Sequence, residues 1–385
     1  MKSKNLIAVT AVAAALSAAS LAAHADGVPQ YSVIDLGAAA GTTTSQGTAL
    51  SSSGNYALGR SLGTSGPGFV WSAGTGRIDW TMPATGNKYV MTGSVMSGGG
   101  VNNYGLAVAT VGTTLSGGTL IPEMWSVSNP TLTALAMPAG YTTGRAADVN
   151  DSGTAVGLVG SGATQKAVIW NTSTNTASIL SATTADGSVM NQANAINNAG
   201  LIVGTGLAAD GTTKVGLVYN SASGVMSTLD ASSIGTGGIS VLGVSENGYV
   251  TGQIGNTAWI WSASTGMHSI ASLVPGSSTA PYGVNSAGWT VGKEGSNAFL
   301  NDGTTTYNLT SLLAPNSGWT LTSTSSAAWS IADNGDILVT GIATTGGAVH
   351  TLLLAPVPEP ASWALMLAGM VSVGAVVRRR AAAQA

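Results

Sequence analysis

Two pairs of carboxylates are the residues of this chain whose type and spacing best suit chemistry. Asp148 and Asp151 flank one short polar segment, and Asp333 and Asp336 flank another. Paired carboxylates divide the acid and base roles in glycoside cleavage. Carboxylate and amide oxygens also suit Ca²⁺, and Asp333-Asn334-Gly335-Asp336 offers such a run. Short acidic segments are equally typical of hairpin turns, and this structural role is the one that we favour.

Other kinds of catalytic site find less support. The chain has no Cys, which excludes disulfides, thiol catalysis and thiolate zinc sites. Beyond the first 25 residues the only histidines are His268 and His350, and we expect both to be exposed strand residues. The zinc-protease, nucleophile-elbow and P-loop motifs are all missing. We therefore expect no enzyme activity, and we assign no catalytic residue, cofactor or metal ligand.

The charge distribution separates the ends of the chain from its body. Only 7% of the residues are charged, and 5 of the 12 basic residues lie in the first four and the last eight positions. The stretch between them holds 7 basic residues and all 15 acidic residues, so its net charge is −8. A mildly acidic body without a basic stripe is a poor nucleic-acid binder, and we expect no such partner.

The N-terminus has the organisation of an export signal. Lys2 and Lys4 precede an apolar run from Leu6 to Leu16 and beyond, and Ala23-His24-Ala25 follows. A basic start, an apolar stretch and an A-x-A site are typical of a signal peptide. We predict a signal helix in residues 1–25, cut after Ala25 by signal peptidase. The alternative is an N-terminal membrane anchor.

The C-terminus, residues 357–385, has a second address. Pro358-Glu359-Pro360 precedes an apolar stretch, residues 361–377, and then Arg378-Arg379-Arg380. The stretch is just long enough for a transmembrane helix, and the arginines should remain on the cytoplasmic side. The body would then be anchored to the inner membrane on its periplasmic side. The alternative is a permanent single-span tail anchor.

This tail resembles the PEP-CTERM sorting signal of Gram-negative bacteria. The match comprises the Pro358-Glu359-Pro360 motif, the apolar stretch beginning Ala361-Ser362-Trp363, and the terminal arginines. The resemblance implies processing by an exosortase, loss of the tail, and a host that makes exopolysaccharide. An address of this kind says nothing direct about what the body does.

The body, residues 26–356, contains seven copies of one pattern. Each copy has an apolar residue, then Asn or a small polar residue, two further residues, Gly, and an apolar pair. The anchor glycines are Gly54, Gly105, Gly153, Gly200, Gly248, Gly288 and Gly335, at spacings of 40 to 51 residues. Asn and Gly tolerate positive φ, so the segment predicts a tight turn between two strands.

Each copy predicts about four strands. In most copies an apolar run follows the glycine by 13 to 20 residues and ends in an aromatic residue, as in Val168-Ile169-Trp170. A polar turn and another apolar run come next. Four strands in 40 to 50 residues are typical of a propeller blade, so we predict an all-β propeller of seven four-stranded blades. A β-solenoid or a stacked-sheet array is the alternative.

The two ends of the body predict that the ring closes. The chain opens with Tyr31-Ser32-Val33-Ile34-Asp35-Leu36-Gly37, an isolated strand with no earlier strand of its own. The seventh copy stops after Leu352-Leu353-Leu354-Ala355-Pro356, one strand short. We expect the N-terminal strand to complete the last blade, since this pairing would remove two open sheet edges.

The repeats also resemble the bacterial extracellular HAF repeat family. The opening strand looks like its usual start, and Asn308 to Leu313, Gly318 to Leu321 and Ile331 to Gly335 look like its usual end. Only His350 lies where the His of a His-Ala-Phe run is expected. The resemblance implies export and a repeat architecture, and it supplies no catalytic residues.

These features predict an exported, noncatalytic repeat protein of the cell surface or biofilm matrix. An uncharged, aromatic-containing surface suits neutral carbohydrate, so exopolysaccharide or another surface protein is the expected partner. The alternative is a propeller hydrolase or lyase that acts on surface polysaccharide, which requires carboxylates to converge on one pocket. A weaker third hypothesis is a sensor or docking ring for another exported protein.

Overall fold

The computed structural model describes residues 29–62, 66–82, 89–91, 99–114, 117–235 and 237–357. The chain divides into two units. Residues 33–355 form the larger unit, which carries the sheets. The smaller unit comprises residues 1–32 and 356–385, and the structure describes only residues 29–32 and 356–357 of it. There the Val357 N–H donates a hydrogen bond of 2.7 Å to the Gln30 carbonyl.

The described residues are strands and turns with two short 3₁₀ helices, so the fold is all-β as predicted. The first sheet has strands β2 (Thr44–Leu50), β3 (Ala57–Leu62), β4 (Gly68–Ser72) and β5 (Gly76–Asp79). The second has β6 (Tyr89–Met91), β7 (Gly100–Val101), β8 (Leu106–Thr114), β9 (Gly117–Ser126) and β10 (Asn129–Ala134). The third has β11 (Gly144–Val149), β12 (Thr154–Val159), β13 (Lys166–Asn171) and β14 (Thr176–Ile179).

Three further four-stranded antiparallel sheets repeat this plan. The fourth has β15 (Val189–Ile196), β16 (Leu201–Leu207), β17 (Lys214–Asn220) and β18 (Val225–Thr228). The fifth has β19 (Ile239–Val244), β20 (Val250–Ile254), β21 (Thr257–Ser262) and β22 (Gly266–Ser269). The sixth has β23 (Thr279–Val284), β24 (Thr290–Glu294), β25 (Asn297–Asn301) and β26 (Thr306–Asn308). The 3₁₀ helices are η2 (Gly162–Thr164) and η3 (Leu309–Leu312).

The seventh group of strands is completed from the start of the chain. It contains β28 (Ala327–Ile331), β29 (Ile337–Ala343), β30 (Val349–Pro356) and β1 (Tyr31–Asp35), with β27 (Trp319–Thr320) beside β29. β1 pairs with β30, as the truncated ends of the repeat pattern predict. A single parallel pair, Thr44 with Val349, links this group to the first sheet, so the two count as one nine-stranded sheet.

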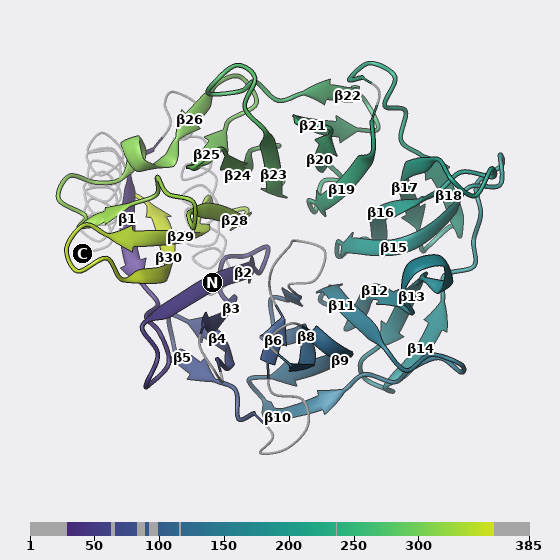
Figure 1. The fold of residues 1–385 in the computed structure, drawn as a ribbon, viewed down its shortest axis with the longest axis horizontal. Coiled ribbons are helices and arrows are strands. Elements are labelled where there is room, and N and C mark those ends of the chain that lie inside the picture. Colours follow the sequence, from purple (N-terminus) through teal and green to yellow (C-terminus); the bar gives the residue numbers. More distant parts are fainter. Residues whose placement is uncertain are drawn as a thin grey trace, which may run out of the picture. The chain divides into compact units, whose positions relative to one another are not determined.

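The sheets follow one another around a common centre (Figure 1). The innermost strands contact one another in the order β2, β7, β11, β15, β19, β23 and β28, and β28 in turn contacts β2. This arrangement of the described strands is propeller-like.

The hydrophobic core lies between neighbouring sheets. One buried cluster, containing Val156, Met190 and Leu217, joins the third sheet to the fourth, and others join the next pairs. The large anchors come from the third strands, as with Trp170 and Trp259, which are fully buried. A glycine on the second strand makes room for each of these two rings. A Cβ at Gly252, for example, would lie 2.4 Å from Trp259 Cζ2.

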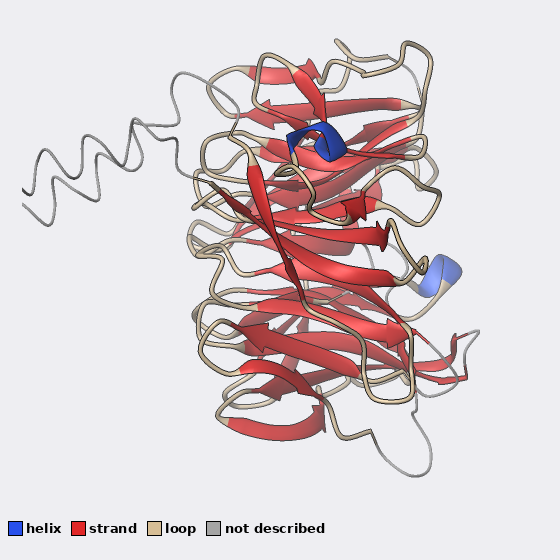
Figure 2. Cartoon of the chain, turned by 90° about the vertical axis from the view of Figure 1, so that its left-hand side faces the viewer, coloured by secondary structure: helices blue, strands red, loops and turns tan. Residues whose placement is uncertain are grey.

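The seven turns between first and second strands lie together on one face of the larger unit, which we call the turn face. Figure 2 shows the strands running between two faces that carry the turns and loops. The seven anchor glycines all lie in these turns, with φ between +75° and +87°. Such values disfavour any side chain, which explains why glycine recurs at this position.

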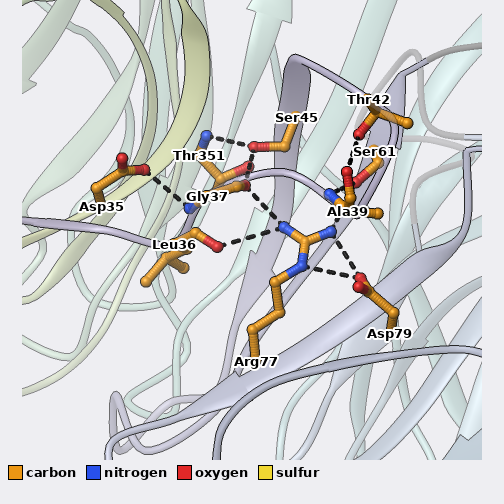
Figure 3. A network of polar contacts seen from close by, with 10 residues as sticks. All are labelled: Asp35, Leu36, Gly37, Ala39, Thr42, Ser45, Ser61, Arg77, Asp79 and Thr351. Carbon is orange, nitrogen blue, oxygen red and sulfur yellow. Dashed lines mark hydrogen bonds and ion pairs between the residues drawn. The ribbon is translucent and has the colours of Figure 1, made fainter.

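A polar clasp holds the segment between β1 and β2 where the seventh group meets the first sheet (Figure 3). Arg77 donates to the Gly37 carbonyl at 2.7 Å and to Ser61 Oγ at 2.6 Å, and it pairs with Asp79. Ser45 Oγ donates to the same Gly37 carbonyl and accepts from the Thr351 N–H at 2.8 Å. Side chains of the first sheet thus hold the chain that follows β1.

Candidate functional site

A central cavity of about 150 Å³ is lined by the innermost strands and by several of the turns that follow them. The lining strands share a local irregularity. In six of them the pairing with the second strand skips one residue, which is a β-bulge. The skipped residues all line the cavity: Thr48, Ala147, Asn194, Leu242, Tyr282 and Trp329. Repeated bulges therefore turn one side chain of each of these sheets toward the centre.

Buried asparagines join the turns of neighbouring sheets. The Asn150 amide donates through Nδ2 to the Asn197 carbonyl at 3.1 Å, and Asn197 donates to the Ser245 carbonyl at 2.9 Å. Asn102 and Asn285 make the same bond to the sheet that follows each of them. The Oδ1 atom of each asparagine accepts from the backbone N–H four residues later, which closes its own turn. One side chain thus fixes a turn and links two sheets.

The next residue of each turn forms the rim of the cavity. Asp151 Oδ1 accepts from the Asn103 N–H at 2.9 Å, and Glu246 Oε2 accepts from the Asn198 N–H at 2.9 Å. In the same way Asp333 Oδ1 accepts from the Ser286 N–H of the sheet before it, at 2.8 Å. The Asp333 N–H donates to the Ser52 carbonyl, which carries the rim from the seventh group to the first sheet.

Two of the rim carboxylates share a donor. Asn198 Nδ2 lies 2.9 Å from Asp151 Oδ2 and 2.9 Å from Glu246 Oε1, so these two oxygens are less than twice that distance apart. Partial burial raises the pKa of Glu246, and the charges of Asp333 and Asp151 add to the rise. The acidic side chains of the rim therefore act on one another electrostatically.

Asp148 lies deeper, at the end of β11. Its carboxylate accepts from the Val149 N–H at 2.8 Å and from the Ile196 N–H of β15 at 3.0 Å. Burial raises its pKa to about 7, although both hydrogen bonds favour the charged form. Gly100 makes room for this carboxylate, since a Cβ there would lie 2.1 Å from Asp148 Oδ1.

The structure brings together most of the carboxylates singled out from the sequence. Asp148, Asp151 and Asp333 all line the cavity, whereas Asp336 does not. Asp336 accepts from Asn334 Nδ2 at 2.8 Å, and burial raises its pKa. The expectation that the four acids are unrelated turn residues is therefore wrong for three of them. Their shared place comes from the ring, which the spacing of single residues does not show.

Glu246 is the rim residue that the search for carboxylate pairs missed. It occupies the same repeat position as Asp151 and Asp333, two residues before the anchor glycine. Alignment of the seven repeats by their glycines would have shown a third carboxylate at this position.

The two histidines lie in different sheets. His268 is an exposed residue of β22. His350 of β30 is only partly exposed, and its Nδ1 lies 2.9 Å from both carboxylate oxygens of Asp35. Its ring also packs against Trp319, with the ring centres 5.6 Å apart. In the part of the chain that the structure describes, no three His, Cys, Asp or Glu side chains converge closely enough to hold a metal ion directly.

The predicted processing residues lie outside the described part of the chain. This applies to Ala25, to Pro358, Glu359 and Pro360, and to the predicted transmembrane stretch 361–377. Among the residues that are described, no helix has the length and apolar character needed to cross a membrane.

Comparison with solved structures finds similarity at the level of the fold. Virginiamycin B lyase from Staphylococcus aureus, in a catalytically inactive form with quinupristin, is 9% identical with a TM-score of 0.51, over 85% of this chain and 100% of that one. YCF48 bound to D1 peptide is 11% identical with a TM-score of 0.48, over 87% and 98%. The extracellular domain of a one-component system from B. thetaiotaomicron is 10% identical with a TM-score of 0.48, and this chain spans 40% of its length. At such identities the likeness concerns the fold alone.

The amino-acid sequence matches one family model, the PEP-CTERM protein-sorting motif, at residues 356–380. No curated protein matches the chain. The chain therefore carries the C-terminal signal of an exported protein that an exosortase sorts and that is anchored in the membrane before processing.

Proposed function

We propose that the chain is a noncatalytic surface protein whose body, a closed seven-bladed propeller, binds or organises exopolysaccharide. Signal peptidase and an exosortase process its two ends. The body is held on the periplasmic side of the inner membrane and then reaches the cell surface or the biofilm matrix. The sorting motif supports the export route.

The engagement of the cavity carboxylates is the observation that carries the noncatalytic assignment. Asp148, Asp151, Glu246 and Asp333 each accept a backbone N–H from a neighbouring sheet. Catalytic carboxylates must exchange protons with substrate or attack it, and these groups are already committed to joining the sheets. The cavity, about 150 Å³, is also smaller than the roughly 300–1,000 Å³ typical of ligand pockets.

The turn face offers the binding surface. Tyr104 is 70% exposed there. Tyr56 and Tyr249 lie flat over the next sheet, where a Cβ at Gly105 or Gly288 would contact their rings at 3.0 and 3.3 Å. Trp289 occupies the same repeat position as Tyr249, and the seven turns hold no Lys or Arg. Aromatic faces beside amides and carboxylates suit neutral sugar rings, while the acidic rim repels anionic polymers.

Co-sedimentation with the host's own exopolysaccharide tests this proposal. We expect Tyr104→Ala and Trp289→Ala to weaken binding about tenfold, which corresponds to the loss of about 1.4 kcal/mol of contact. Trp319→Ala is the matched control, because Trp319 pairs with Ala343 at the end of β29 remote from the turn face. Equal binding by the wild-type protein and both turn-face variants would contradict the proposal.

A polysaccharide hydrolase or lyase is the second candidate. The observation that favours it is the meeting of Asp148, Asp151, Asp333 and Glu246 at one cavity. Asp148 has a pKa of about 7, in the range of a general acid. New reducing ends that form with the wild-type protein and disappear with Asp148→Asn would favour this candidate.

A further inference from the structure

The central cavity presents oxygen atoms and negative charge without a positive partner. Asp148, Asp151, Glu246 and Asp333 all line it, and no Lys or Arg does. Glu246 and Asp148 repel each other, and the charges of Asp151 and Asp333 act on Glu246 as well. Like charges gathered in a partly desolvated place are costly unless a cation compensates them.

Asn194 supplies an independent indication of a ligand. Its side chain lines the cavity from β15 and is only 3% exposed. Nδ2 donates to the Val241 carbonyl at 2.7 Å, and this bond fixes which way the amide points. Oδ1 has no hydrogen-bond partner among the described residues. A buried amide oxygen without a donor requires a water molecule or a cation.

A second oxygen of the lining is in the same condition. Thr48, the bulged residue of β2, has a buried hydroxyl without a partner among the described residues. Asp148 and Asn194 lie on adjacent inner strands, since the Asp148 carboxylate accepts from Ile196, two residues after Asn194. The carboxylate and the free amide oxygen therefore belong to the same junction of two sheets.

The donor set identifies the class of ion. Carboxylate, amide and hydroxyl oxygens are the ligands of hard divalent cations, which complete their shells with water. At about 30 Å³ per water molecule, a cavity of about 150 Å³ has room for a hydrated ion. Because no three acidic side chains converge on one point among the described residues, the rim carboxylates can reach such an ion only through water.

We propose that the central cavity binds a partly hydrated divalent cation, Ca²⁺ or Mg²⁺, with the Asp148 carboxylate and Asn194 Oδ1 as its protein ligands. The ion would balance the rim charges and tie the third sheet to the fourth. This site differs from the calcium site weighed at Asp333 to Asp336, since Asp336 lies outside the cavity.

Terbium luminescence tests the proposal directly, because Trp329 lines the cavity and can sensitise a bound Tb³⁺ ion. The full-length chain is titrated with TbCl₃ after treatment with a chelator, and Ca²⁺ or Mg²⁺ is then added in competition. We expect Trp-sensitised emission that Ca²⁺ displaces at about 0.1–1 mM, the range of extracellular calcium sites. The comparison of the two competing ions shows which of them the site prefers.

Variants locate the site. Asp148→Asn and Asn194→Ala should each weaken Tb³⁺ and Ca²⁺ binding at least tenfold. Asp336→Asn removes the same charge from the same face outside the cavity and should leave binding unchanged. Trp329→Phe should abolish the emission while calorimetry still detects Ca²⁺ binding, and this result does not depend on the folding of the acid variants.

Two results would overturn the proposal. One is the absence of any calorimetric or luminescent signal for the wild-type protein with up to 10 mM of either ion. The other is binding that Asp336→Asn weakens as much as folded Asp148→Asn does, since this would place the ion at the exposed turns.

Discussion

Single amide side chains carry much of the order of the turn face. Asn197 is nearly fully buried, closes its own turn through Oδ1 and reaches the next sheet through Nδ2. Neither bond can be replaced by water at this depth, so the residue type matters at this position more than at the exposed turns.

We predict that Asn197→Ala lowers the free energy of unfolding by about 2–3 kcal/mol, because it leaves the Ser245 carbonyl and the Leu201 N–H without partners. Urea unfolding measures the change. Asn220→Ala is the control, since Asn220 is exposed and bonds only to Ala222 and Ser223 of its own turn. A loss at position 197 no larger than at position 220 would show that the inter-sheet bond contributes nothing.

Asp336 gives the pH dependence its direction. Burial raises its pKa, so the folded state binds a proton more tightly than the unfolded state does. The charged form therefore costs stability above the ordinary pKa of Asp, and this cost falls as the pH is lowered through the folded pKa. The corresponding residues of the second and fourth sheets are Leu106 and Leu201.

We predict that Asp336→Leu raises the melting temperature at pH 7 and that its advantage over the wild-type protein shrinks between pH 7 and pH 4. Melting curves across this range measure the difference. An advantage that is constant with pH would mean that the apolar contact, rather than the carboxylate, determines the effect.

At the scale of the strands, the small residues of the second strand are as informative as the large residues of the third. Gly252 faces Trp259, and an added Cβ would lie 2.0 Å from the Ser240 carbonyl oxygen and 2.4 Å from the indole ring. The sheet therefore accepts the tryptophan only because the facing strand has no side chain at this position.

We predict that Gly252→Ala destabilises the protein by about 1–3 kcal/mol through overpacking. Differential scanning calorimetry measures the loss. Gly238→Ala is the matched control, because the nearest atom to its added Cβ is Lys214 Cδ at 4.0 Å. Equal melting temperatures for the two variants would be inconsistent with this explanation.

The repeated turn could be predicted from the sequence because its chemistry is local. An Asn or small polar residue followed three positions later by Gly dictates a turn wherever it occurs, and the apolar runs around it dictate strands. The meeting of Asp148, Asp151, Glu246 and Asp333 could not be predicted in this way. Their side chains come from four sheets, and only the curvature of the whole array brings them to one cavity.

At the scale of the whole molecule, the junction between the last sheet and the first depends on the clasp. Arg77 contacts the Leu36 and Gly37 carbonyls, and its guanidinium lies 3.8 Å above the centre of the Phe69 ring. The incomplete first and last repeats predicted the pairing of β1 with β30, but nothing in the sequence singled out Arg77. Its role depends on segments far apart in the chain.

We predict that Arg77→Met loosens this junction, because it removes charge-assisted bonds worth roughly 1.5–3 kcal/mol each. Hydrogen exchange should become faster in residues 36–45 and 349–355 and stay unchanged in the third, fourth and fifth sheets. Arg145→Met is the control for loss of an arginine elsewhere. A uniform increase in exchange over all sheets would contradict a local role for the clasp.

The central claim is that this body binds surface polysaccharide without cleaving it. The most direct measurement incubates the full-length protein with the host's exopolysaccharide and follows co-sedimentation and new reducing ends in one tube. The account predicts sedimentation with the polymer, and no reducing ends above those of the polymer alone. Reducing ends that accumulate with the wild-type protein and vanish with Asp148→Asn would contradict it and identify the cavity as an active site.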